Sequence, residues 1–260
     1  SSAYGKLNDR TTQRRAEVSF TPVGEWESTA VLYPYLSTAI GSSIFTATDK
    51  PLVIKTLDGT TLTFSAAALT KVPDMILSAT KTRFGECTFT CIGTNSTAWT
   101  TANSLLTIAL AAFADTTLDP ANIKTEPVTA AWGATPWDSF QTAEGFVIST
   151  ETSVQNIETD SDGLVDMMLS KIEVKAKARV LGLDETQLLT ALKVQGAGNA
   201  RGTTLSGSDL VITATTGTIT LKGAALDMGG YEFGHAALRL GELQWVATRT
   251  LSLGVVQPLM

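Results

Sequence analysis

Short alternations of apolar and polar residues dominate the chain and predict β-strands. Residues 16–23 alternate in this way, with Val18 and Phe20 on one face. Further runs of strand length occupy residues 51–57, 60–65, 83–93, 210–214, 218–222 and 238–250. Asp58-Gly59 separates two of these runs and favours a type I′ hairpin turn, which needs positive φ at both central residues. The pattern therefore predicts a mainly β protein built largely from hairpins.

Two segments show helical spacing instead. Trp26, Ala30 and Tyr33 share one face and predict a short helix over residues 25–36, which Pro34 ends or kinks. Residues 183–194 carry a leucine stripe and are followed by a glycine-rich segment, as expected for a second short helix.

The main elements occur twice in the same order. Eleven of the 44 positions from 24 to 67 are identical to the residues 158 positions later, where unrelated sequences would share roughly three. Leu52-Val53-Ile54 returns as Leu210-Val211-Ile212, and Arg83 to Phe89 returns as Arg239 to Trp245 at an offset of 156 (239 minus 83). We therefore expect two copies of one β-module.

The two copies depart from each other within the hairpin. Leu62 and Phe64 alternate one position out of step with Ile219 and Leu221. Because a shift of one residue turns every side chain of a strand to the other face, we expect a bulge or a slip in register there.

The longest β pattern lies at the start of the second copy. Residues 146–159 run into Asp160-Ser161-Asp162-Gly163, and residues 164–180 run back. This predicts a hairpin with arms of roughly fourteen residues, against a usual strand of about five or six. A module of this size cannot cover such a hairpin, so we expect a partner to cover one face. Two separate strands joined by a bend are the alternative.

These features predict three segments. Residues 1–95 form a first module with an N-terminal arm, residues 96–143 form a Pro-containing connector, and residues 144–260 form a second module with the long hairpin. Within the connector, residues 104–114 fit either a helix or a buried strand. Trp132 and Trp137 are expected to pin the connector to its own module or to a neighbouring subunit.

Composition and charge disfavour several classes of function. The 260 residues are 43% hydrophobic and 17% charged, as in globular proteins. The net charge of -6 and the absence of a basic run disfavour phosphate binding. The first dozen residues are mostly polar and do not match a signal peptide, and the most apolar run, residues 105–114, is about half the length of a membrane span. We therefore expect no membrane segment.

Residues for catalysis or metal binding are scarce. Cys87 and Cys91, four apart on a strand, would lie roughly 13 Å from each other, beyond the reach of a disulfide, so both are expected to be reduced. His235 is the only histidine. Asp160, Asp162 and Asp166 lack the glycine and glutamate spacing of a calcium loop. We therefore predict no enzymatic activity, no cofactor and no metal.

The order of the elements carries a family signal. The hairpin that turns at residues 160–163, the strand 171–181 before the helix 183–194, the strand pair around Gly217 and the closing strand from Arg239 follow one another. This order resembles the major tail tube protein of long-tailed bacteriophages, over residues 144–250 and, through the repeat, over residues 16–95. The resemblance implies two tandem modules of the β-sandwich or barrel type, each with a short flanking helix.

The resemblance also implies a function in the virion. Such proteins form rings that stack into a hollow tail tube through which DNA passes to the host without specific binding. A chain with two modules is expected to form a trimeric ring with pseudo-sixfold symmetry. The implied partners are further copies of the chain and the tail terminator, tape measure and distal tail proteins, with assembly in the host cytoplasm.

Two sets of site residues follow from this reading. Glu86 and Glu242 are candidate acids of the lumen, where carboxylates would repel DNA, although each could instead pair with Arg83 or Arg239. The candidate contacts between subunits or rings lie at the hairpin turn: Asp160, Asp162, Gly163 and Asp166. The alternatives are a trimeric tail hub or distal tail protein that forms a single ring, and a glycan-binding β-sandwich with Trp132 and Trp137 as its platform.

Overall fold

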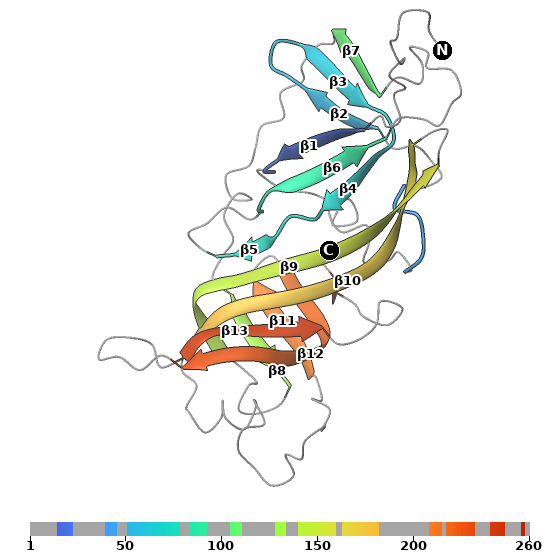
Figure 1. The fold of residues 1–260 in the computed structure, drawn as a ribbon. Helices are drawn as coiled ribbons and strands as arrows, with labels where there is room; N and C mark the ends of the chain where they lie inside the picture. Colours follow the sequence, from blue (N-terminus) through green and yellow to red (C-terminus); the bar gives the residue numbers. More distant parts are fainter. Residues whose placement is uncertain are drawn as a thin grey trace, which may run out of the picture.

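The structure, a computed structural model, has only β-strands as regular secondary structure in the residues that it describes (Figure 1). The described residues are 15–22, 40–45, 51–78, 84–92, 105–110, 128–133, 140–159, 163–181, 208–214, 217–231, 240–247 and 256–257. The expected mainly β fold is confirmed. Both expected helices fall outside these residues. Among the described residues, no helix has the length and apolarity that a membrane crossing needs.

The strands form three sheets. Those of the first half are β1 (Ala16–Phe20), β2 (Leu52–Lys55), β3 (Thr60–Phe64), β4 (Ala67–Lys71), β5 (Met75–Leu77), β6 (Cys87–Cys91) and β7 (Leu106–Leu110). Those of the second half are β8 (Thr129–Trp132), β9 (Phe140–Thr159), β10 (Gly163–Leu181), β11 (Ser208–Ala214), β12 (Gly217–Tyr231), β13 (Leu240–Ala247) and β14 (Val256–Gln257). Two small sheets have the orders β1-β6-β4 and β2-β3-β7, and the large sheet runs β10-β13-β12-β11-β8-β9-β5, with β14 beside β12.

The large sheet closes into a barrel because β9 also pairs with β10. Its interior holds an aromatic cluster in which Trp245, fully buried, has ring centroids 5.9 Å from Phe140, 6.1 Å from Phe146 and 6.2 Å from Trp132. Burial of such large apolar side chains is the main source of stability in a core of this kind.

The long hairpin is present and is longer than expected. β9 has 20 residues and β10 has 19, and they pair from Thr159 opposite Gly163 to Gln141 opposite Leu181. The expected arms of roughly fourteen residues and the alternative of two separate strands are therefore wrong. One end of the hairpin belongs to the barrel, and the rest runs along the first half of the chain (Figure 1).

The chain itself covers part of the hairpin that we expected a partner to cover. Leu164, Met167 and Leu169 of β10 are 5%, 5% and 0% exposed. Segment 40–45 pairs with this stretch of β10, with Gly41 N donating to Leu169 O at 2.8 Å and Ile44 N to Met167 O at 2.8 Å. β5 pairs with β9 on the other arm. Residues from the first half therefore cover this part of the hairpin, and a partner on the rest of it stays a prediction.

The two halves of the chain share one pattern of strand pairing. In the first half, β6 pairs with β1 on one side and with β4 on the other. In the second half, β13 pairs in the same way with the end of β10 on one side and with β12 on the other. Each residue pair between β4 and β6 has a counterpart between β12 and β13: Ala67–Cys91 matches Ala224–Ala247, Ala68–Thr90 matches Ala225–Val246, Leu69–Phe89 matches Leu226–Trp245, and Lys71–Thr88 matches Met228–Gln244. Even the register shift after Leu69 recurs after Leu226.

The expected slip between the copies lies at the hairpin turn. Ile54 pairs with Leu62, whereas Ile212, 158 positions after Ile54, pairs with Ile219, only 157 positions after Leu62 (219 minus 62). The first hairpin thus has one more residue in its turn, and this extra residue restores the apolar face.

The turn itself differs from the expected type I′. Only Gly59 has positive φ, 85°, and Asp58 does not. Gly59 N donates to Thr56 O at 3.0 Å, and the Asp58 carboxylate accepts hydrogen bonds from the Thr56 hydroxyl and from Thr60 N. A turn over residues 56–59 whose last residue is a left-handed glycine needs positive φ at one position instead of two.

Of residues 104–114 the structure describes 105–110, and these contain neither a helix nor a buried strand. They contain β7, which pairs with β3 at the edge of the small sheet β2-β3-β7. Leu106, Ile108 and Leu110 of β7 are 39%, 66% and 86% exposed. Periodicity alone does not show whether anything packs on an apolar strand, so the sequence does not predict this exposure.

Candidate functional site

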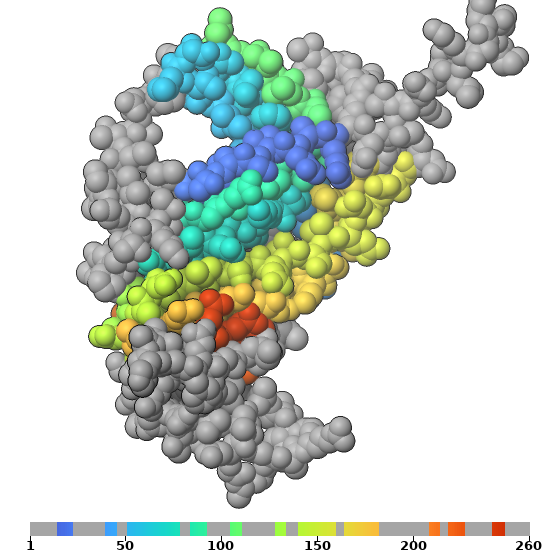
Figure 2. All heavy atoms as spheres, turned by 60° about the vertical axis from the view of Figure 1, so that its left-hand side comes forward, coloured from blue at the N-terminus to red at the C-terminus, as the bar shows by residue number. Residues whose placement is uncertain are grey.

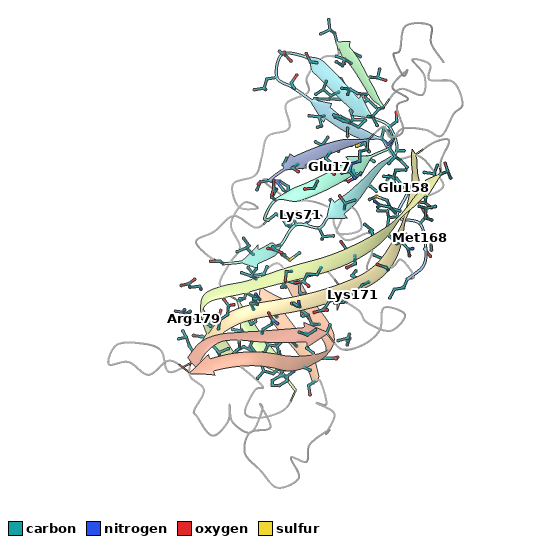
Figure 3. The ribbon with its side chains drawn as sticks, in the orientation of Figure 1. Glu17, Lys71, Glu158, Met168, Lys171 and Arg179 are labelled. Carbon is teal, nitrogen blue, oxygen red and sulfur yellow. The ribbon has the colours of Figure 1, made fainter. Side chains whose placement is uncertain are left out.

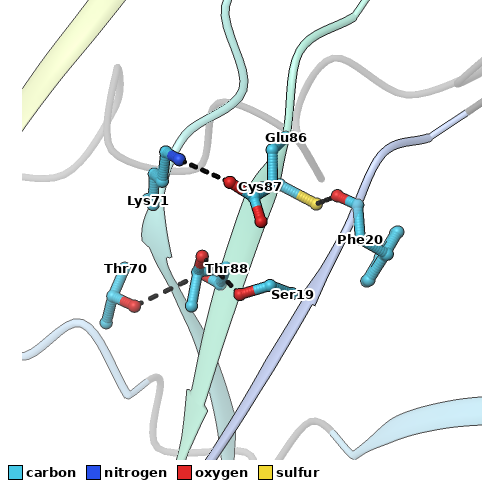
Figure 4. A network of polar contacts seen from close by, with 7 residues as sticks. All are labelled: Ser19, Phe20, Thr70, Lys71, Glu86, Cys87 and Thr88. Carbon is cyan, nitrogen blue, oxygen red and sulfur yellow. Dashed lines mark hydrogen bonds and ion pairs between the residues drawn. The ribbon is translucent and has the colours of Figure 1, made fainter.

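Glu86, the first candidate lumen acid, lies one residue before β6 and forms an ion pair. Its Oε2 lies 2.8 Å from Nζ of Lys71, at the end of β4 (Figure 4). The hydrogen bond from Lys71 to this carboxylate raises the pKa of Lys71. Both side chains are more than half exposed, so the pair adds little stability but fixes where the carboxylate lies. The pairing partner is Lys71, and Arg83 falls outside the described residues.

A row of hydroxyl groups crosses the same small sheet. The hydroxyls of Ser19 and Thr88 are 2.8 Å apart (Figure 4). Those of Thr70 and Thr90 are 3.0 Å apart. Cross-strand pairs of this kind join β1, β6 and β4 side by side.

The other face of β6 carries the two cysteines. Cys87 and Cys91 are fully buried and free, in agreement with the expected reduced thiols. Cys87 Sγ donates to Phe20 O at 3.3 Å. Burial raises the pKa of Cys87, and it raises the pKa of Cys91 to about 11. Such thiols are inert, which makes them residues of the core and not of a reactive site.

Glu242, the second candidate lumen acid, occupies the equivalent position on β13. It precedes Leu243, and Leu243 corresponds to Cys87 in the shared pairing pattern. Glu242 is exposed and lies directly opposite Arg179 of β10. The structure therefore places the two candidate acids at matching positions of the two halves, each with a cationic side chain on a neighbouring strand.

A ladder of charges lies along the outer face of the long hairpin. Lys175 Nζ is 2.9 Å from both Glu151 and Glu173, and Lys171 Nζ is 2.5 Å from Glu173. Hydrogen bonds from the two lysines lower the pKa of Glu173, and hydrogen bonds to Glu151 and Glu173 raise the pKa of Lys175. Figure 3 shows Lys171 and Arg179 along β10, so this ribbon presents alternating charges and not a purely acidic surface.

The candidate contacts at the hairpin turn have different outcomes. Asp160 and Asp162 lie outside the described residues, and Gly163 is the first residue of β10, opposite Thr159. Asp166 is half-buried and bonds within the chain. Its Oδ1 accepts from Ser43 Oγ at 2.6 Å and from Met167 N at 2.7 Å. Asp166 therefore holds segment 40–45 on β10 in the isolated chain.

Trp132 does not provide the exposed platform that glycan binding would need. Its ring packs against Trp245, and Nε1 donates to Ala224 O at 2.8 Å. Trp137 and His235 fall outside the described residues. Within the part of the chain that is described, no three His, Cys, Asp or Glu side chains are grouped so that they could hold a metal ion.

Sequence reasoning missed the partners of the candidate acids. Lys71, Arg179 and Ser43 come from strands or segments far from Glu86, Glu242 and Asp166 in the sequence. The signal that could have identified Lys71 and Arg179 is the register of the repeat, because cross-strand neighbours follow once the pairing is known.

The arrangement offers paired charges, sheet edges and an exposed apolar strand, all of which are means of association. No family model matches the chain, and no curated protein matches it.

Proposed function

We propose that this chain is a structural protein of a long-tailed bacteriophage virion, whose rings stack into the hollow tail tube. The observation that carries the proposal is the pair of matching strand sets. β1, β6 and β4 share register and register shift with β10, β13 and β12, as two modules of a pseudo-symmetric ring would. Three chains would place six such modules around an axis.

The long hairpin supports the same proposal. β9 leaves the barrel, and its pairing partner changes from β8 at Phe140 and Gln141 to β5 at residues 146–148. A strand that crosses from one module to the next in this way can set the angle between them. In a ring, a constant angle between neighbouring modules is what closure requires.

The matching positions of Glu86 and Glu242 support their assignment to one surface of the ring. In a pseudo-sixfold ring, equivalent positions lie at equal distances from the axis, so two exposed acids per chain would give six. Carboxylates there would repel the phosphates of passing DNA.

Charge reversal tests this assignment. The double change Glu86→Lys and Glu242→Lys should leave tube formation intact and slow DNA release from assembled particles. Glu158→Lys, at an exposed position near the hairpin turn, is the matched control and should release DNA at the normal rate. Normal release from the double variant would refute the lumen assignment while leaving the tube proposal in place.

Electron microscopy tests the proposal as a whole. Negatively stained protein over a concentration series should show long hollow tubes, with threefold symmetry in end-on views. Rings that never stack would favour a tail hub or distal tail protein. Rings of six chains would overturn the trimer and keep the tube. Monomers at every concentration would count against both.

A further inference from the structure

The small sheet β2-β3-β7 has one apolar face. Leu52 and Ile54 of β2 lie opposite Phe64 and Leu62 of β3, and these two lie opposite Leu106 and Ile108 of β7. Direct cross-strand partners point to the same side of a sheet. The other side carries mainly threonines together with Lys55, Val53 and Ala109. Leu110 lies on the same side as Leu106 and Ile108, opposite Thr60. We call the side formed by Leu52, Ile54, Leu62, Phe64, Leu106, Ile108 and Leu110 the apolar face.

In the second half of the chain, the equivalent face is buried. Leu210, Ile212, Ile219 and Leu221 hold the same positions in the pairing of β11 with β12. They are between 0% and 2% exposed because β8 and β9 complete the barrel over them. Their counterparts Leu52, Ile54, Leu62 and Phe64 are only half-buried.

Among the described residues, the first half has no strands at the places of β8 and β9. Strand β11 pairs with β12 on one side and β8 on the other, whereas among the described residues β2 pairs with β3 alone. Likewise β10 pairs with both β13 and β9, whereas β1 pairs with β6 alone in the described part. Figure 2 shows β2, β3 and β7 at one end of the molecule, with an opening between them and β1.

Part of the apolar face is exposed. Ile108 is 66% exposed and Leu110 is 86% exposed, next to half-buried residues on two neighbouring strands. Contiguous apolar surface of this kind marks an interaction site. Among the described residues, one edge of β2 has no neighbouring strand, and a further strand could pair with it.

We propose that a second copy of this chain covers the apolar face of β2-β3-β7. The occupant follows from the comparison within the chain, because strands of this same sequence already cover the equivalent face in the second half. An apolar face without charged side chains also fits a partner surface of the same apolar kind. The inference rests on the proposed self-assembly and adds the surface at which one copy meets the next.

Two neighbouring positions of β7 test it. Ile108→Glu places a carboxylate on the apolar face, and Ala109→Glu places the same side chain on the opposite side of the same exposed strand. Sedimentation velocity over a concentration series should show that Ile108→Glu needs at least tenfold more protein to assemble than the wild type, and that Ala109→Glu assembles normally. Both variants should keep the wild-type circular dichroism spectrum, since both sites are exposed in the monomer.

Labelling gives a second readout. Cys87 and Cys91 are buried, so a cysteine introduced by Leu110→Cys would be the reactive thiol. It should react with a maleimide in dilute monomer and become at least tenfold slower in assembled protein. Equal rates in both states would overturn the proposal.

The outcomes separate this inference from the proposed function. Tubes formed equally well by the wild type and Ile108→Glu would keep the tube and overturn the docking surface. Oligomers of the wild type that Ile108→Glu abolishes, but that never stack, would support the docking surface and count against the tube. A wild type that stays monomeric at every concentration would overturn both.

Discussion

At Gly145 the backbone of β9 lies against that of β5, and replacing this glycine gives a sharp test of the structure. Gly145 has φ 86°, and a Cβ added there would lie 1.8 Å from the carbonyl oxygen of Leu77 in β5. Gly41 has nearly the same φ, 88°, and no atom within 4 Å of its added Cβ. The pair Gly145→Ala and Gly41→Ala therefore separates backbone strain from the steric clash.

The expected magnitudes differ several-fold. A left-handed conformation costs an alanine about 1–2 kcal/mol, which is partly offset because alanine also restricts the unfolded chain, so Gly41→Ala should lower the unfolding free energy by about 1 kcal/mol. In Gly145→Ala the backbones of β5 and β9 also have to move apart by about 1.2 Å. This is the difference between 3.0 Å, the shortest contact that a Cβ makes, and the 1.8 Å to Leu77 O. That movement would break the pairing of Met75, Ile76 and Leu77 with β9 and expose Leu77, now 2% exposed. With about 1 kcal/mol net per hydrogen bond and the lost packing, we expect about 3–5 kcal/mol in total.

Urea unfolding followed by circular dichroism measures both values under one set of conditions. Hydrogen exchange at residues 75–77 should accelerate in Gly145→Ala and stay at the wild-type rate in Gly41→Ala. If the two variants lose the same stability to within about 0.5 kcal/mol, the close approach of β5 to β9 is wrong.

The other predictions concern the core, the hairpin contact, the thiols and the charge ladder. Trp245→Ala empties the centre of the barrel and should cost about 3–5 kcal/mol in urea unfolding, and a loss under 1 kcal/mol would contradict the aromatic core. Asp166→Ala removes two hydrogen bonds and should cost about 1–2 kcal/mol, with faster hydrogen exchange confined at first to segment 40–45, whereas unchanged exchange would refute this contact. Cys87 and Cys91 should not react with a disulfide reagent at pH 8 until denaturant is added, because burial raises the pKa of both, and rapid reaction of the folded protein would contradict their burial. Because the pKa of Glu173 is lowered from 4.5, its ion pairs contribute above that pH and the contribution is lost as the pH falls through the lower folded pKa. Glu173→Gln should therefore be less stable than the wild type by up to about 1 kcal/mol at pH 7 and equal to it near pH 2, and a constant difference across this range would exclude the linkage.

The internal repeat shows which parts of the fold can be predicted from the sequence. Identical residues around Leu52 and Leu210 predicted two matching hairpins and a slip between them, and both are present in the pairing. They were predictable because strand period and register leave a direct trace in the order of apolar residues. The correspondence of Leu69 with Leu226 is harder to find in the sequence. It appears only when the two copies are aligned with the one-residue difference at the hairpin turn.

What the sequence did not reveal depends on contacts between distant segments. Nothing in the apolar run from Leu106 to Leu110 distinguishes a strand on a covered sheet from one on an open sheet. The pairing of segment 40–45 with β10 joins residues more than 120 positions apart, as for Ser43 and Asp166, and local pattern carries no signal for it. The candidate acid Glu86 was identified, but its partner Lys71 required the register of β4 with β6.

The shared hairpin has a consequence for how the chain unfolds. Tandem copies of a module usually melt as separate units, each with its own midpoint. Here β9 and β10 contribute Phe146 and Ala176 to the barrel, and Leu169 of β10 packs beneath segment 40–45 of the first half. Neither half keeps its core if the hairpin separates. We therefore expect the described parts of both halves to melt together in one cooperative transition, so that a duplicated sequence behaves as a single thermodynamic unit.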